Sequence, residues 1–396
     1  MFHARFPNAR HFTASLFGCQ YHGSSPNESK LSLIGKFDGL LRDGAIHVEA
    51  FEQNDLPSKV WMSHWESPQD FKAWWESPDV VSFWAALPDD AGFWRETVSL
   101  PATRSMYMAN KETPHGFGHC GELIPLTEKM GYWGAYRSRL TPETPDTKFS
   151  SPLSALPKPK PPSEEIRPGR IRITKFPDNI CVVVEGQDYG AMRPPERAYW
   201  DENFDGLAKQ WITNVMTAGS AQGLVSGRAC HAFGSGKQQL GASSSGSGTL
   251  TKVTSHDTSG PESSDDDVDV KSEGSDGSSS LFPGLDYVRQ AQLLFWLDMS
   301  YMEHLGRWDK VHIKLRKDFM SAYGPGGAMA GGELLLWVDL GILKGDEMDA
   351  EYVGCYEGTG FMAYDHDAAF ESRRDAQSAG LPAFFDEPRG SKPMEW

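Results

Sequence analysis

The chain has few positive charges and no long apolar run, and both absences exclude classes of function. Its 396 residues include 38 Lys and Arg against 54 Asp and Glu, a formal charge of −16. Nucleic-acid binding needs Lys and Arg clustered against phosphate, so this balance argues against a nucleic-acid partner. A membrane span needs about 18 consecutive apolar residues. The longest apolar stretches, such as 334–338, are only as long as a strand, which argues against a membrane protein.

Cysteine is also scarce, and the first residues do not form a secretory signal. The five cysteines are widely spaced and none lies in a C-x-x-C pair, so the sequence predicts neither a zinc knuckle nor a thioredoxin motif. Polar residues including Arg5 and Arg10 interrupt residues 1–15 before an apolar segment is complete. We therefore expect a reduced, cytoplasmic protein in which most cysteines are small buried hydrophobes.

Aromatic residues are abundant, whereas two segments depart from the composition of a folded domain. Aromatic residues make up 12% of the chain, with 13 Trp, which favours an ordered core or a pocket lined with rings. Residues 156–168 are proline-rich and predict an extended connector. Residues 234–280 are rich in Ser, Gly, Thr and Asp, contain no aromatic residue, and carry eight acidic against three basic side chains. We expect a disordered insertion there, either a simple solvated loop or a site of regulatory phosphorylation.

The remaining segments alternate between strand and helix patterns. Strands are predicted at 12–20, 60–65, 95–107, 170–176, 180–184 and 333–340. Helices are predicted from Pro68, which Ser67 precedes as a cap, and at 80–87, 196–218 and 286–321. The same order of elements in both parts predicts an α+β protein with two related ferredoxin-like halves that enclose a pocket. The predicted units are 1–155, the connector 156–168, 169–386 interrupted by 234–280, and a tail at 387–396.

Several motifs resemble the haem-containing aldoxime dehydratases, the phenylacetaldoxime dehydratase family. The most specific are GYWGAYRSRL at 131–140, DNICVVVEGQDY at 178–189 and EHLGRWDKVHIKLRKDF at 303–319. Weaker ones are WESPQDFKAWW at 65–75 and GFWRE at 92–96. Their order and approximate spacing agree with the family from about residue 12 to residue 362. On these segments the chain is identified as a divergent member.

The resemblance implies a fold, a cofactor and a reaction. It implies two ferredoxin-like halves that form a dimeric α/β-barrel-like body, with haem b between a helix and the sheet and a homodimer as the assembly to test. The family converts an aldoxime to a nitrile with loss of water. The substrate nitrogen binds ferrous iron, and a nearby acid protonates the leaving hydroxyl. We therefore expect a haem-dependent lyase that acts on a small aldoxime-like molecule.

Two catalytic candidates follow from the resemblance. Arg139 lies at the second Arg of the family's GYWG-x-x-R-x-R motif, where it would hold a substrate oxygen or a haem propionate; the alternative is a surface ion pair. Glu185 replaces the family's serine. In an apolar, aromatic pocket its pKa would rise, so that it could donate a proton near neutral pH. The alternatives for Glu185 are an ion pair with Arg139 or a position in solvent.

The iron ligand and the distal acid are less direct. The family's H-P-T-H motif aligns with 312–315, which retains its first histidine as His312 but has Leu315 at the ligand position. We predict His312 as the axial ligand of the haem iron, with His304 as a further candidate. Val338 stands at the position of the distal histidine. The neighbouring Asp339 is either an acid or, as we expect, an exposed strand residue.

Other functions stay open at this point. The loss of three expected side chains supports a divergent haem-binding member that acts on another N–O or N–N substrate, or a non-catalytic binding protein. A third hypothesis is an interaction protein that works through its acidic insertion. His115, His119 and Cys120 have metal-like spacing, with a simple loop as the alternative. The glycine-rich segment 324–332 lacks the Lys of a P-loop and predicts a turn.

Overall fold

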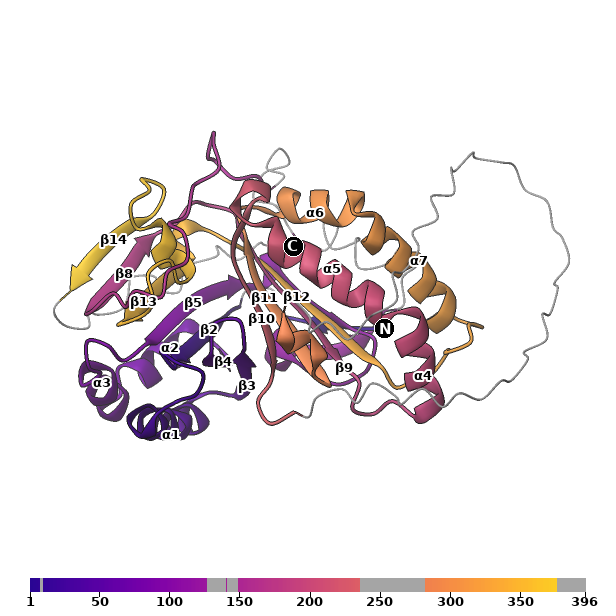
Figure 1. Cartoon of the computed structure of the whole chain (residues 1–396), viewed down its shortest axis with the longest axis horizontal. Coiled ribbons are helices and arrows are strands. Elements are labelled where there is room, and N and C mark those ends of the chain that lie inside the picture. Colours follow the sequence, from indigo (N-terminus) through magenta and orange to yellow (C-terminus); the bar gives the residue numbers. More distant parts are fainter. Residues whose placement is uncertain (8–9, 127–139, 141–148, 236–281, 376–396) are drawn as a thin grey trace, which may run out of the picture.

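A computed structural model describes residues 1–7, 10–126, 140, 149–235 and 282–375. Within these ranges the strands form one antiparallel sheet in the order β14-β8-β13-β5-β2-β4-β3-β10-β11-β9-β12-β6-β1-β7 (Figure 1). The predicted insertion at 234–280 lies almost entirely outside the described residues, as do Arg139 and the predicted tail.

Seven strands precede the connector in the described residues: β1 Phe2–Arg5, β2 His11–Gln20, β3 His47–Gln53, β4 Ser58–Trp65, β5 Phe93–Pro101, β6 Ser105–Ala109 and β7 Glu122–Pro125. After the connector they are β8 Arg170–Lys175, β9 Ile180–Asp188, β10 Leu224–Ala232, β11 Arg289–Trp296, β12 Leu335–Leu343, β13 Met348–Val353 and β14 Glu371–Asp375. The α-helices are α1 Glu28–Gly44, α2 Pro68–Trp75, α3 Pro78–Ala85, α4 Pro194–Asn203, α5 Asp205–Ala218, α6 Met299–Trp308 and α7 Lys310–Tyr323.

Two groups of four strands share one arrangement. The chain order β2-α1-β3-β4-α2-α3-β5 gives the sheet order β5-β2-β4-β3, and β9-α4-α5-β10-β11-α6-α7-β12 gives β12-β9-β11-β10. The second strands of the two groups, β3 and β10, pair with each other and join the groups. Helices α1 to α3 cover one group and α4 to α7 cover the other (Figure 1).

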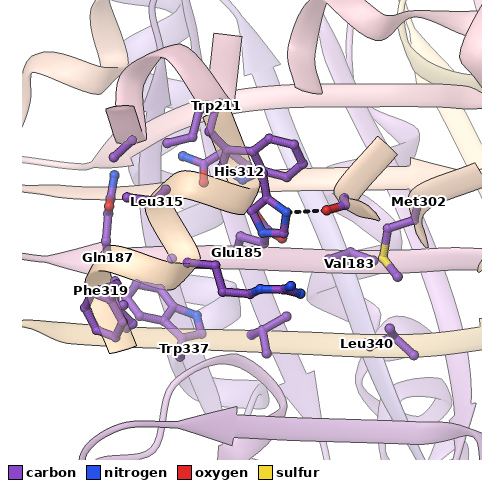
Figure 2. Close-up of a pocket in the computed structure, with 18 of the residues that line it drawn as sticks. Val183, Glu185, Gln187, Trp211, Met302, His312, Leu315, Phe319, Trp337 and Leu340 are labelled. Atoms are coloured by element: carbon purple, nitrogen blue, oxygen red, sulfur yellow. Dashed lines mark hydrogen bonds between the residues drawn. The ribbon is translucent and has the colours of Figure 1, made fainter. Parts of the chain in front are cut away.

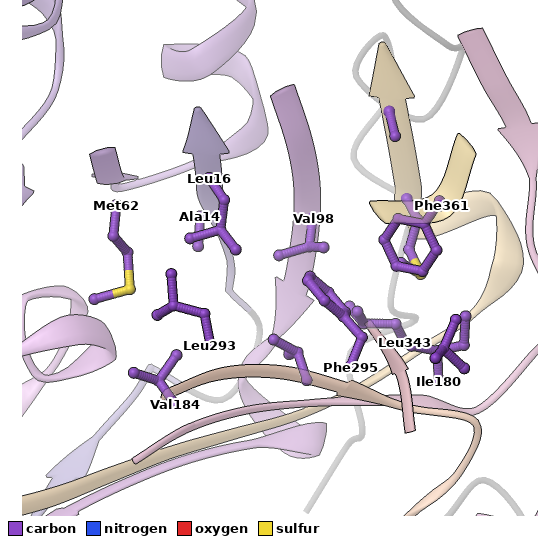
Figure 3. Packing of buried hydrophobic residues seen from close by; sticks show 14 of the residues in the cluster. Ala14, Leu16, Met62, Val98, Ile180, Val184, Leu293, Phe295, Leu343 and Phe361 are labelled. Carbon is purple, nitrogen blue, oxygen red and sulfur yellow. The ribbon is translucent and has the colours of Figure 1, made fainter. Parts of the chain in front are cut away.

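The inner faces of the two groups pack together to form the main core. Ala14, Leu16 and Val98 from the first group lie opposite Leu293 and Phe295 from the second (Figure 3). The outer faces of both groups are covered by helices, so that strands such as β9 are apolar on both sides. This double coverage explains why these strands read as almost continuous apolar runs in the sequence.

Most of the tryptophans in the first half belong to a core beneath α1 to α3. Trp61, Trp65, Trp74, Trp75 and Trp84 are all buried in this cluster. The tryptophans of the 65–75 motif therefore stabilise the packing of α2 on β2 and β4, and they do not line the pocket described below. The cysteines behave as expected, since four of the five are buried.

The helix predictions succeed where caps are visible and fail where a strand is apolar. Ser67 caps α2 through a 3.1 Å hydrogen bond from the Asp70 backbone amide, as predicted. The predicted helix at 196–218 is instead two helices that meet at Phe204. The predicted helix at 286–321 is wrong in its first part, because 289–296 is the buried strand β11 and the helical segment begins only after Asp298. Within the described ranges, no helix is both long and apolar enough to cross a membrane.

Candidate functional site

A cavity of about 230 Å³ lies between the sheet and helices α5, α6 and α7 (Figure 2). Four of the motif positions singled out in the sequence meet here. Glu185 projects from β9, Val338 from β12, and His312 and Leu315 from α7. Because β9 and β12 pair with Val338 directly opposite Glu185, these two residues share the face of the sheet that looks toward the helices.

His312 is held in an orientation that suits a metal ligand. Its Nδ1 lies 2.5 Å from the carbonyl oxygen of Gly306, and its ring stacks on Trp211 with centroids 4.2 Å apart (Figure 2). Asp309 caps α7 by accepting a 2.8 Å hydrogen bond from the His312 backbone amide. A neutral imidazole that donates from Nδ1 carries its lone pair on Nε2, and ligating histidines are usually fixed in this way. Burial lowers the pKa of His312, which favours that neutral form.

The other helix candidates differ in position. Leu315 lies one turn after His312 and lines the same cavity. His304 is exposed on α6, does not line the cavity, and lies beside Trp308, which is also exposed. Of the two histidines proposed as axial ligand, the structure therefore brings only His312 to the pocket.

Glu185 carries a proton more readily than an ordinary carboxylic acid. Its side chain borders the cavity but is otherwise surrounded by protein, and this burial raises its pKa to about 7; a hydrogen bond from the Trp211 side chain offsets part of the effect. The raised pKa predicted from the sequence is confirmed. Its predicted alternative partner, Arg139, lies outside the described residues.

Gln292 is a polar residue of the pocket that sequence reasoning missed. It lies on β11 directly opposite Glu185, is 3% exposed, and lines the cavity. Its Nε2 is buried without a hydrogen-bond partner among the described residues. A buried amide that lacks a partner costs free energy unless a ligand satisfies it. The QAQ alternation at the start of β11 is the only sequence signal for this residue, and the predicted helix at 286–321 hides it.

Most of the remaining wall is apolar, and its other polar side chains are Gln187, Glu303 and two arginines. Trp211, Phe319 and Leu340 supply ring and aliphatic surface, and Arg307 and Arg316 are the cationic residues of the lining. A flat apolar macrocycle with carboxylate substituents needs such a wall, an axial nitrogen and cations at the rim. The orphaned Gln292 amide and the Nε2 lone pair of His312 therefore fit a bound haem and a polar ligand beside it.

Asp339 does not belong to this pocket, and its predicted exposure is wrong. The side chain is completely buried on the face of β12 opposite to Val338, where its Oδ1 accepts a 3.0 Å hydrogen bond from the Phe117 backbone amide. Burial raises its pKa well above the ordinary value. The error arises because both faces of β12 are covered: Val338 faces the cavity below the helices, and Asp339 lies beneath the Gly116–Cys120 turn.

Comparisons with known proteins agree with this geometry. The family model described as haem-containing dehydratase matches residues 15–361. Phenylacetaldoxime dehydratase of Bacillus sp. (strain OxB-1) is 24% identical over 350 residues, which cover 82% of this chain and 80% of that protein.

Two solved structures share the fold. An aldoxime dehydratase (OxdRE) in complex with butyraldoxime has a TM-score of 0.65 at 15% identity, with 91% of this chain and 88% of that chain covered. A second aldoxime dehydratase has a TM-score of 0.65 at 17% identity, with 91% and 90% covered.

Proposed function

We propose, from the premise that this chain belongs to the haem-containing dehydratase family, that its pocket converts an aldoxime to a nitrile with loss of water. The membership rests on the match of the family model to residues 15–361, which is most of the chain. The aldoxime substrate is taken from the names of the similar proteins. The observation that carries the proposal is the convergence of His312 and Glu185 in one apolar cavity.

His312 would hold haem b through Nε2, since its Nδ1 is engaged with the Gly306 carbonyl oxygen. Haem iron supplies Lewis-acid and electron-donating chemistry to a substrate nitrogen when it is bound. Arg307 and Arg316 line the cavity and would supply the positive charge for the haem propionates, with Arg307 also 3.7 Å from Glu303. Arg139 is proposed to hold a substrate oxygen or a propionate, as the family motif suggests.

Glu185 would act as the acid that protonates the leaving hydroxyl. Val338 cannot transfer a proton, so the role that the family gives to a distal histidine falls to another group in this pocket. A carboxyl group with a pKa of about 7 is protonated in a large fraction of molecules at neutral pH. Gln292, directly opposite, would donate a hydrogen bond to the same oxygen and orient it.

The test is an assay of the purified, haem-loaded protein under reducing, anaerobic conditions against a panel of alkyl and aryl aldoximes. We expect nitrile to form from at least one of them, measured by gas chromatography. A protein that shows the Soret band of bound haem but forms no nitrile from any aldoxime would refute the proposal.

That second outcome would favour the divergent alternative. Three departures support it, namely Glu185 for serine, Val338 for the distal histidine and Leu315 at the ligand position of the motif. The protein would then bind haem and act on another N–O or N–N substrate, or bind a ligand without turnover. Spectral titration of the haem-loaded protein with hydroxylamine and hydrazine derivatives, followed by analysis of the products, separates these two possibilities.

We further propose that the body consists of two ferredoxin-like halves, 1–155 and 169–386, joined by the connector 156–168. The shared strand orders β5-β2-β4-β3 and β12-β9-β11-β10 support this. Both groups follow the β-α-β-β-α-β order along the chain, with their first and third strands in the centre and their second and fourth strands at the sides. A homodimer and a cytoplasmic location stay predictions from the family resemblance and the sequence.

A further inference from the structure

We propose that His47, Glu49 and His119 form a second site, separate from the haem pocket, that binds a first-row divalent transition-metal ion such as Zn²⁺. None of these residues lines the cavity between the sheet and α5 to α7. His47 and Glu49 lie two residues apart on β3, so they project from the same face of the strand. His119 comes from the 3-10 turn Gly116–Cys120, which crosses this face.

The distances suit a metal ion. One ligand atom from each residue lies within 4.8 Å of the other two. The His47 Nε2 and Glu49 Oε1 atoms are 3.3 Å apart. Two ligands that are each about 2.0–2.1 Å from a tetrahedral zinc ion are separated by about 3.3–3.4 Å, so this pair needs almost no movement to accept the ion. The rings of His47 and His119 are stacked, with centroids 3.4 Å apart and planes 19° apart, so one ring must turn for both to bind the same ion.

Two histidines at the site, His119 and His64, have lowered pKa values and ring nitrogens without partners among the described residues. His119 Nε2 is buried without a hydrogen-bond partner among the described residues. Burial, and then the neighbouring His47, lowers the pKa of His119 to about 4. His64 pairs with His47 across β3 and β4, is completely buried, and has neither ring nitrogen satisfied. Burial lowers its pKa to about 3. Neutral imidazoles with unsatisfied nitrogens are good metal ligands and are costly without a metal.

Glu49 supplies the negative charge. Although burial opposes ionisation, hydrogen bonds from His115 and His47 and the charge of Arg289 hold the pKa of Glu49 well below its usual range. Arg289 donates to Glu49 Oε2 at 3.0 Å, whereas the 3.3 Å contacts from His47 and from the Gly116 amide both reach Oε1. The arginine thus fixes one oxygen of the carboxylate, and the other oxygen faces the histidines.

The site is also accessible. His47 retains 30% of its side-chain exposure, and His119 lines a surface cleft with Arg5, Arg10 and Glu122. The sequence had suggested a different trio, His115, His119 and Cys120. His115 instead lies 3.0 Å from Arg289 and stacks on Trp337, and burial raises the pKa of the Cys120 thiol. Only His119 of that trio belongs to the group with metal-ligand spacing.

The test uses the full-length, haem-loaded protein after treatment with a chelator. Equilibrium dialysis against buffered Zn²⁺, with metal and iron measured by mass spectrometry, should show one saturable zinc per chain in addition to the haem iron. His47→Ala and His119→Ala should weaken zinc binding about 100-fold or more, since even outer-shell changes cost about 10- to 100-fold. His304→Ala, a matched change of an exposed histidine, should leave zinc binding unchanged.

A further variant and a spectroscopic measurement guard against unfolded or indirect effects. His312→Ala should keep the zinc, which separates this site from the haem pocket. X-ray absorption at the zinc edge of the wild-type protein should show two imidazole ligands and oxygen ligands at about 2.0–2.1 Å. The proposal is overturned by no saturable zinc in the wild-type protein, by full retention of zinc in both His47→Ala and His119→Ala, or by a spectrum without imidazole.

Discussion

At the scale of single residues, the chemistry of the pocket depends on one exchange of a side chain. A glutamate stands where the resembling family has serine, and its pKa of about 7 makes it a group that both holds and releases a proton near neutrality. A serine hydroxyl can donate and accept hydrogen bonds but does not titrate under the same conditions. The exchange therefore places a titrating acid beside Val338, which lies directly opposite on β12 and cannot transfer a proton.

Glu185→Gln should abolish most turnover without loss of haem. Glutamine keeps the shape of the glutamate side chain but has no acidic proton to transfer. A positioned general acid contributes about 10²- to 10⁴-fold to a rate. The wild-type kcat should fall about tenfold for each pH unit above about 7, because the protonated carboxyl is lost there, and the residual rate of the variant should lack this limb. A variant with unchanged kcat, or the same alkaline limb in both proteins, would assign the acid to another group.

The same substitution should change stability in a pH-dependent way. A carboxyl whose pKa is raised on folding contributes stability that is fully present below about pH 4.5 and is lost as pH rises to about 7. At about 1.4 kcal/mol per pKa unit the loss is at most about 3.5 kcal/mol, and less because Glu185 borders the cavity. In haem-free protein, Glu185→Gln should be more stable than wild type at pH 8 and similar to it near pH 4.5. Urea unfolding at both pH values measures this, and a difference that does not vary with pH would contradict it.

At the scale of elements, helix α7 decides where an axial ligand can lie. Positions 312 and 315 are about one turn apart and both line the pocket. The Asp309 cap and the Gly306 carbonyl oxygen orient only His312. The helix thus offers two places for an imidazole, of which this chain occupies the earlier.

His312→Ala should lose the axial ligand, and a second change on the same helix should restore it. We expect the Soret band of His312→Ala to shift and its haem to dissociate on gel filtration. The double variant His312→Ala with Leu315→His should regain a histidine-ligated spectrum, because the new ring projects into the same cavity. His304→Ala is the control and should match wild type. An unchanged spectrum in His312→Ala would exclude this residue as the ligand.

Elements also show where reasoning from sequence reaches its limit. The α2 helix was predictable because Ser67 and Pro68 are local signals that need no knowledge of distant contacts. Strand β11 was not predictable from local signals, because its segment QAQLLFW is buried between two strands that are distant in sequence. The insertion separates it from β10, and β9 lies still earlier in the chain. Periodicity alone cannot distinguish such a run from a buried helix. Glu185 was found through a motif, whereas Gln292 became visible only once β11 was paired with β9.

At the scale of the whole molecule, buried charges join the two groups of strands. Arg228 on β10 donates two hydrogen bonds to Glu96 on β5, at 2.9 and 2.6 Å, and its guanidinium lies 4.1 Å from the ring centroid of Trp94. Tyr352 on β13 donates to the same carboxylate at 2.8 Å. The side chains of Arg228 and Glu96 are only 5% and 1% exposed. One network therefore connects three strands that are far apart in sequence.

Breaking this network should destabilise the whole chain. Arg228→Met leaves the Glu96 carboxylate buried without its counter-ion, which costs about 3–5 kcal/mol. The double variant Arg228→Met with Glu96→Gln should recover much of this, because no net charge then remains inside. Arg5→Met removes an exposed partner of Glu122 and should cost less than about 1 kcal/mol.

Urea unfolding followed by fluorescence and by circular dichroism should give one coincident transition in each protein, since the core and the network span both groups of strands. A loss below 1 kcal/mol in Arg228→Met, or two separate transitions in the wild-type protein, would show that the halves do not depend on this contact.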